Sequence, residues 1–293
     1  METKKLQRLC LGAHMSIKNG FWQAVKDGAS IECQSIQFFS KSNRQWYAKK
    51  ITQDEVTDFQ NGLKGTKITL QSIMVHASYL INIASSNQEV FAKSKKALLI
   101  EIERCAQLGV PFLVLHPGSR LDFSIKQAIE QASNCLDEVI YESNAPVTIL
   151  IENMAGQGSS IGSTFEELGM LFNLLSQTSK QKLGFCIDTC HLFAAGTDYH
   201  TTDAYENLWK TVMQHIPLDH IKAFHINDSK TKCGSHVDRH EHIGHGLIPL
   251  RSFQLLLQDK RFWHIPKILE TPYASLDDHK KNISILVQLA SKT

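Results

Sequence analysis

Residues 111–152 read PFLVLHPGSRLDFSIKQAIEQASNCLDEVIYESNAPVTILIE and contain one complete β–α–β repeat of this chain. Two short apolar runs, 111–115 and 147–151, predict buried strands, and the longer segment 122–142 between them has the spacing of a helix. A metal-ligating residue type follows directly after each strand, His116 after the first and Glu152 after the second. Because the strands of such repeats are parallel, both side chains are expected at the same end of a sheet.

The same alternation of short strands and longer helices extends outward over the rest of the chain. Strands are predicted at 8–13, 34–39, 70–75, 111–115, 147–151, 183–187, 220–224 and 266–269, and helices at 19–28, 52–64, 88–108, 122–142, 164–178, 202–215, 248–259 and 277–290. Eight such units without a break in composition predict an α/β protein, a single (β/α)8 TIM barrel that forms one domain over residues 1–293. A doubly wound open sheet is the alternative, but no glycine-rich phosphate-binding turn follows an early strand.

Charge and cysteine content narrow the class of protein. The net charge of +2 is too small to predict a nucleic-acid partner, although bound divalent cations would raise it. There is no run of about 18 apolar residues, so no membrane-spanning helix and no membrane partner are expected. The first residues lack a secretory signal pattern. Seven cysteines without disulfide-framework spacing predict reduced thiols and a cytoplasmic protein.

Candidate metal ligands follow six of the predicted strands. They are His76, His116, Glu152, Asp188, His225 and Glu270, and three more, His191, Asp238 and His240, lie in the loops just after two of those strands. Asp238 and His240 are two residues apart, so in an extended segment they share a face and can bind one ion. A zinc ion takes about four donors, so this set predicts several zinc ions at the carboxyl-terminal ends of the barrel strands. Such sites commonly hydrolyse phosphate esters.

Other candidate patterns in the chain are weaker. HEHIG (240–244) resembles the HExxH helix of metalloproteases, but its last residue is glycine and the segment is a poor helix former. Cys186 and Cys190 lack zinc-ribbon spacing, and Cys186 is expected to pack inside the barrel. His14 also ends a strand and is expected to pack or to form a hydrogen bond. The histidines in helix or loop contexts are expected at the surface, namely His200, His215, His220, His264 and His279.

Six segments resemble the sequence motifs of one enzyme family. They are HASYLIN (76–82), LHPGS (115–119), ENMAGQG (152–158), GFCIDTCH (184–191), HINDSKTKCGSHVDRHEHIGHG (225–246) and ETPY (270–273). Together they resemble the endonuclease IV family of apurinic/apyrimidinic endonucleases over nearly the whole chain. The resemblance implies a TIM barrel with three zinc ions (Zn²⁺) per chain. It implies that His76 and His116 hold the first ion and that Glu152 bridges this ion to the second. It implies that the second ion is completed by Asp188, His225 and Glu270. The third ion is implied to be held by His191, Asp238 and His240.

The resemblance also implies the reaction and the DNA contacts. The enzyme would cut double-stranded DNA 5′ to an abasic site, leaving a 3′-hydroxyl and a 5′-deoxyribose phosphate, and would also clean blocked 3′ ends. Glu152 would be the catalytic residue that helps to orient the nucleophile. FSKSNRQW (39–46) resembles the family's DNA-entering loop, with Arg44 as the inserted side chain, and Tyr79 and Leu80 resemble residues of a second such loop. The implied protein is a monomer, associated with the nucleoid if its source is bacterial.

Two other classes of function fit part of the pattern. A metal-dependent sugar isomerase or epimerase shares this barrel type, but it uses one or two ions and would leave His76, His116, His191, Asp238 and His240 without a role. A non-catalytic DNA-binding barrel with structural zinc is the second alternative. Structural zinc sites are usually rich in cysteine, whereas no cysteine is among the nine candidates.

Overall fold

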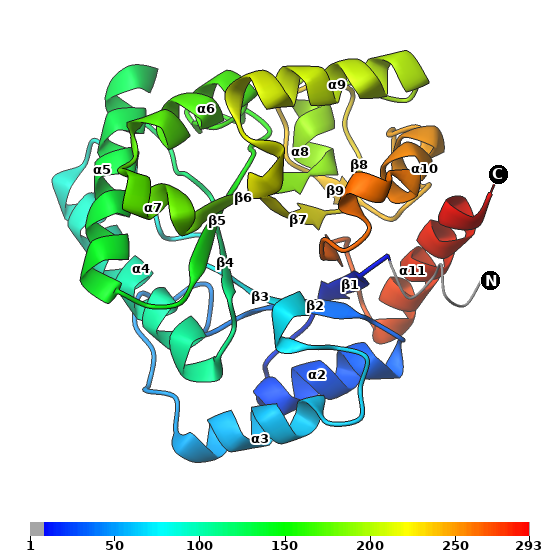
Figure 1. Cartoon of the computed structure of the whole chain (residues 1–293), viewed down its shortest axis with the longest axis horizontal. Coiled ribbons are helices and arrows are strands. Elements are labelled where there is room, and N and C mark those ends of the chain that lie inside the picture. The colour runs from blue at the N-terminus through cyan, green and yellow to red at the C-terminus, as the bar shows by residue number, and fades with distance from the viewer. Residues whose placement is uncertain (1–8, 293) are drawn as a thin grey trace.

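Eight parallel strands close into a barrel in the computed structural model, which describes residues 9–292 (Figure 1). Around the barrel the strands run in the order β1, β10, β7, β6, β5, β4, β3, β2. Their bounds are β1 (Leu11–His14), β2 (Ser35–Phe39), β3 (Ile73–His76), β4 (Phe112–Leu115), β5 (Thr148–Glu152), β6 (Leu183–Asp188), β7 (Ile221–His225) and β10 (Lys267–Leu269). The predicted α/β class and TIM-barrel architecture are confirmed.

Helices surround the barrel on its outside (Figure 1). They are α2 (Phe21–Ser30), α3 (Gln53–Leu63), α4 (Gln88–Leu108), α5 (Ile125–Ser143), α6 (Phe165–Leu174), α7 (Gln177–Gln181), α9 (Thr202–His215), α10 (Leu250–Gln258) and α11 (Leu276–Ser291). The short helix α8 (Thr189–Ala194) follows β6 directly and is buried on the inner side of α9 (Figure 1). Three short 3-10 turns, η1 (Leu70–Ser72), η2 (Leu218–His220) and η3 (Lys260–Phe262), precede β3, β7 and β10. Helices α4 and α9 have the predicted bounds, and Gly109 ends α4 in the left-handed conformation, with φ of 73°.

Two predicted segments differ from the structure. The helix predicted at 164–178 is two helices, α6 and α7, because Leu175 is extended and buried and the Ser176 side chain caps α7. The segment after β6 was expected to be a loop, but it forms α8, whose first turn is capped by Asp188 accepting a hydrogen bond from the backbone N–H of His191. The segment 226–247, between the predicted strand 220–224 and the predicted helix 248–259, contains a short antiparallel pair, β8 (Asp228–Ser229) and β9 (His240–Glu241).

The barrel interior is filled by one layer of apolar side chains below the strand ends. Met74, Val114, Leu150, Cys186, Ala223 and Ile268 form this inner cluster, one from each of six strands, and all are fully buried. Each lies two residues before one of the six strand-end candidates, and side chains two apart on a strand point to the same face. The inner cluster therefore directs those six candidates towards the barrel axis, and the expected packing of Cys186 is confirmed.

Two further sequence expectations concern membrane spans and thiols. No helix within residues 9–292 is long and apolar enough to cross a membrane. All seven cysteines, from Cys10 to Cys233, are free thiols, and five of them are buried.

His279 is a correction to the expected surface histidines. It lies on α11 with no exposed surface, and its ring packs against Tyr273 at 4.5 Å between centroids. Burial, and then the nearby His14, lower the pKa of His279 to about 4. Its position in an amphipathic helix could not reveal this, because the buried face of α11 depends on where the helix docks on β1.

His279 makes the stability of the fold depend on pH. Its pKa is below the unfolded value, so the unfolded chain binds the proton more tightly and the stability falls as pH decreases from about 6.5 towards 4. Between pH 7 and pH 5 this residue should account for a loss of about 2 kcal/mol. Urea unfolding of wild type and His279→Phe at both pH values measures the difference. Equal losses in the two proteins would show that His279 does not cause the decline.

Candidate metal centre

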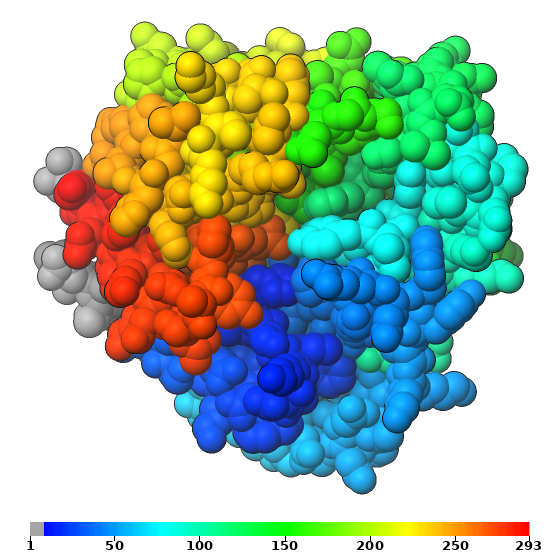
Figure 2. Space-filling view, turned by 180° about the vertical axis from the view of Figure 1, so that it is seen from behind, coloured from blue at the N-terminus to red at the C-terminus, as the bar shows by residue number. Residues whose placement is uncertain are grey.

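The nine predicted ligands converge at the carboxyl-terminal end of the barrel. His76, Glu152, Asp188 and His225 are the last residues of β3, β5, β6 and β7. His116 lies just after β4, and Glu270 lies just after β10. His191 lies in α8, Asp238 lies before β9, and His240 is the first residue of β9. Segments that are far apart in the chain, coloured blue, cyan, yellow and orange, adjoin near the middle of the face in Figure 2.

Three sets of these candidates have donor atoms that all lie within 4.8 Å of one another. These groups are His76, His116 and Glu152; Glu152, Asp188, His225 and Glu270; and His191, Asp238 and His240. The family resemblance implies the same three sets of residues. Glu152 belongs to two of the groups, which is the arrangement that a bridging carboxylate requires.

Glu152 is the centre of the cluster and is fully buried. Its Oε1 lies 2.8 Å from His225 Nδ1 and 3.3 Å from His191 Nδ1. Its Oε2 lies 3.1 Å from His116 Nε2 and 3.3 Å from His76 Nε2. Burial alone raises the pKa of this carboxyl, but His225 and His116 hold it well below its ordinary value. The neighbouring histidines therefore favour the ionised form of Glu152.

Two histidine nitrogens in the third group have no hydrogen-bond partner. His191 donates from Nδ1 to the carbonyl of Asn153 at 2.8 Å, and His240 donates from Nδ1 to the carbonyl of Glu270 at 3.2 Å. The Nε2 atoms of both rings are buried without a hydrogen bond, although each lies 3.2 Å from the Asp238 carboxylate. Orphaned buried nitrogens beside a carboxylate are the donor set that a zinc ion would satisfy.

Cys190 also lies within reach of Asp188 and His240. Burial raises the pKa of its thiol to about 12, and Sγ donates to the carbonyl of Arg239 at 3.7 Å. A zinc ligand must be a thiolate, so this protonated thiol is a poor donor compared with the imidazoles beside it. The structure gives no reason to add Cys190 to the nine candidates.

Buried amides support the cluster, and the sequence reasoning missed them. Asn227 donates to Asp188 Oδ2 at 2.6 Å and accepts from the backbone of Glu270 at 2.7 Å. Gln37 donates to Glu270 Oε1 at 2.7 Å and accepts from His225 Nε2 at 2.9 Å, which leaves Nδ1 of that ring for the cluster. Such contacts orient metal ligands and select their tautomer. Asn227 could have been suspected two residues after His225, but nothing in the strand pattern marks Gln37.

The predicted DNA-contact residues lie on loops at the same end. Arg44 is exposed on the loop after β2. Tyr79 is exposed on the loop after β3, and its ring centroid is 5.2 Å from His76 and 5.4 Å from His116, so it borders the first donor group. Leu80 beside it is half-buried. HEHIG (240–244) begins as β9 and continues as a turn, so it is not a metalloprotease helix.

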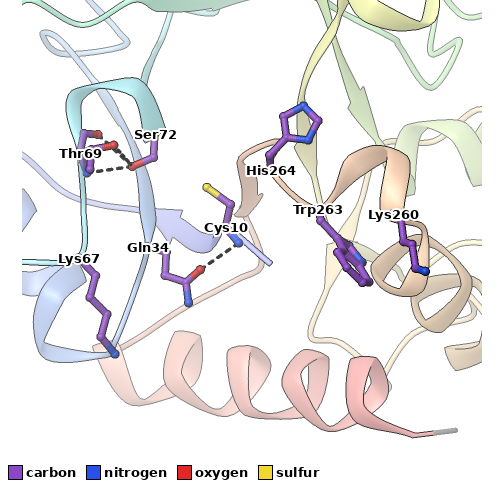
Figure 3. A pocket seen from close by; sticks show the side chains of 8 residues that line it. All are labelled: Cys10, Gln34, Lys67, Thr69, Ser72, Lys260, Trp263 and His264. Carbon is purple, nitrogen blue, oxygen red and sulfur yellow. Dashed lines mark hydrogen bonds between the residues drawn. The ribbon is translucent and has the colours of Figure 1, made fainter. Parts of the chain in front are cut away.

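A separate pocket of about 680 Å³ lies at the opposite end of the barrel. Its lining residues include Cys10, Ser72 and His264, which precede β1, β3 and β10 (Figure 3). None of the nine candidate ligands lines it. All nine candidates lie instead at the carboxyl-terminal rim, where TIM-barrel active sites are found.

A closed parallel barrel with a buried cluster of histidines and carboxylates at this rim defines a class of metal-site barrel enzymes. The sequence profile of the family described as "Xylose isomerase-like TIM barrel" matches residues 25–289. The chain is 39% identical to "Probable endonuclease 4" of Chloroflexus aggregans, over 96% of this chain and 98% of that protein. It is 38% identical to "Apurinic-apyrimidinic endonuclease" of Caenorhabditis elegans, over 93% of this chain and 68% of that protein.

The crystal structure of endonuclease IV from Thermus thermophilus has the same fold, with a TM-score of 0.81 and 30% identity over 97% of this chain and 99% of that one. The chain belongs to the endonuclease IV family of the xylose isomerase-like TIM barrels, and it is a nuclease.

Proposed function

We propose that this chain is a DNA repair endonuclease that hydrolyses the phosphodiester 5′ to an abasic site in double-stranded DNA. The products would be a 3′-hydroxyl and a 5′-deoxyribose phosphate, and the same chemistry would remove blocking groups from 3′ ends. The observation that carries the proposal is the set of three donor groups at the barrel rim, with the buried Glu152 at its centre. Relatives named as endonuclease 4 and apurinic-apyrimidinic endonuclease support the choice of substrate. We further propose that the protein acts as a monomer in the cytoplasm.

The three donor groups would hold three zinc ions. When bound, zinc lowers the pKa of water to about 7 and neutralises charge on a phosphate. The chain's own contribution is to hold nine donors in a fixed arrangement. Both oxygens of Glu152 are already engaged with histidines, so we propose that this carboxylate orients the reacting groups and is not a free base.

Selection for abasic DNA would come from the loops at the rim. A nucleotide without a base leaves the duplex at low unstacking cost, so a pocket can accept it and exclude an intact nucleotide. Exposed Arg44 and Tyr79, with Leu80, would fill the gap that remains. A sugar isomerase of the same barrel type is less well supported, because it leaves the third donor group, centred on Asp238, without a role.

Incision of a duplex with one abasic site tests this function. The purified protein should cut the damaged strand at the 5′ side of the site, at least about a hundredfold faster than an undamaged duplex. A chelator should abolish the cut, and added zinc should restore it. Product ends are mapped by gel mobility and by extension with a polymerase, which needs a 3′-hydroxyl. Cleavage on the 3′ side, or equal cutting of both duplexes, would contradict the proposal.

A further inference from the structure

Two irregular loops carry the residues proposed to contact DNA. The segment 40–52 follows β2 and carries Arg44, and the segment 77–87 follows β3 and carries Tyr79 and Leu80. Neither loop contains a helix or a strand. Backbone ladders therefore do not fix their shape, and side-chain contacts must do so.

Glu101 on α4 lies beneath both loops and contacts each of them. Its carboxylate accepts a hydrogen bond from Ser40 Oγ at 2.6 Å in the first loop and from the backbone N–H of Ser78 at 3.3 Å in the second. Lys41 Nζ pairs with the same carboxylate at 3.0 Å. Glu101 is only 1% exposed, so these contacts are shielded from water and from screening by salt.

Arg104, one helical turn further along α4, holds the first loop at both ends. Its Nε donates to Ser40 Oγ at 2.9 Å and its Nη2 donates to the Ser40 carbonyl, while Nη1 donates to the Lys49 carbonyl at 2.7 Å. The rigid guanidinium fork fixes the distance between these two points of the chain. Lys41 Nζ also donates to the Gln45 carbonyl at 2.8 Å, which closes the part of the loop that contains Arg44.

A direct bond also joins the two loops. Ser78 Oγ donates to the carbonyl of Asn43 at 2.8 Å. Asn43 directly precedes Arg44 in the chain, and Ser78 directly precedes Tyr79. The positions of Arg44 and Tyr79 are therefore coupled through Ser78 and through the buried charges beneath it.

We propose that Glu101 and Arg104 form a shared support that fixes the two loops relative to each other before DNA arrives. They are positioning residues, because they are buried beneath the loops and bond to none of the nine candidate ligands. Ordering a loop only on binding would lower the affinity, and a preformed loop avoids that cost. The role in DNA recognition rests on the proposed function, whereas the support of the loops does not.

Arg104→Lys tests the support. It keeps the positive charge at this position and leaves the Lys41–Glu101 ion pair in place, but it removes the fork that binds Ser40 and Lys49. Trypsin cleaves after Arg44, Lys49 and Lys50, which are exposed, so the cleavage rate measures how well the loop is ordered. Arg104 donates to the carbonyl of Lys49, which belongs to the bond that trypsin would cut. Cleavage within 41–50 should become about tenfold faster, because the loop opens more often. Glu101→Gln removes the charge and should give a larger increase.

The second measurement is binding, by the metal-loaded protein, of a duplex that carries a tetrahydrofuran abasic analogue and an uncleavable linkage on its 5′ side. Arg104→Lys should weaken this binding about tenfold, with little change for an undamaged duplex. Zinc content per chain should stay at the wild-type value. Lys95→Met is the matched control, because Lys95 lies on the same helix but pairs with Glu138 and Glu142 on α5. It should behave as wild type in both measurements.

Distinct outcomes separate the two proposals. Unchanged cleavage within 41–50 in both variants would overturn the support, as would faster cleavage spread over the whole chain. Faster cleavage within the loop with unchanged binding of abasic duplex would overturn its role in recognition. If the wild-type protein does not incise abasic DNA while Arg104→Lys still releases the loop, the proposed function fails and the support of the loops remains.

Discussion

Replacing Glu152 with glutamine is expected to lower kcat for incision by about four orders of magnitude while the barrel stays folded. The substitution keeps the shape of the side chain but removes its charge. Four imidazoles contact the two carboxylate oxygens within 3.3 Å, and the same oxygens are shared by two donor groups. An amide nitrogen at one of these positions cannot accept from a histidine or bind a cation. Two of the three proposed metal positions are therefore damaged at once.

Single-turnover incision of an abasic duplex measures the effect of Glu152→Gln, and circular dichroism and zinc content establish the state of the protein. Glu103→Gln is the matched control, because Glu103 is an exposed carboxylate on α4 whose side chain accepts a hydrogen bond from Gln107 on the same helix. The control should incise as wild type does. Turnover by Glu152→Gln within about tenfold of wild type would contradict a central role for this carboxylate.

The second large effect is expected at Asp228, which the sequence reasoning did not single out. Its buried carboxylate accepts four backbone hydrogen bonds of 2.8 to 3.0 Å, from Ser229, Gly244, Gly246 and Ile248. These bonds close the loop that carries Asp238 and His240. Gly246 is required there, because a Cβ atom would lie 2.4 Å from Asp228 Oδ1.

Asp228→Ala should therefore release the loop, because four donors lose their acceptor at a cost of about 1 kcal/mol or more each. We expect zinc content to fall by about one ion per chain and incision to fall about a thousandfold. Urea unfolding, metal analysis and incision kinetics measure these losses. Asp219→Ala, at an exposed carboxylate in η2, is the control. Full zinc content in Asp228→Ala would show that other contacts hold the loop.

Local patterns in the sequence were sufficient for the barrel. Apolar runs of strand length and helical spacing depend on neighbouring residues, so the eight strands and the bounds of α4 and α9 could be predicted. The period of two along a strand also explains why a ligand at position 152 or 188 points inward above Leu150 or Cys186. Where a cap or a buried side chain overrides the pattern, as at Leu175 and in α8, the prediction was wrong.

The sequence by itself determined the fold class and the nine chemically suitable residues, six at the strand ends and three in the segments that follow. Only the tertiary structure decided which donors lie together, because that depends on barrel closure between segments far apart in the chain. Gln37 contacts His225 and Glu270 across 188 and 233 residues, and no local pattern encodes such a contact. The burial of His279, the four bonds to Asp228 and the shared contacts of Glu101 have the same origin. Each depends on where separate elements dock, which is set by packing over the whole barrel.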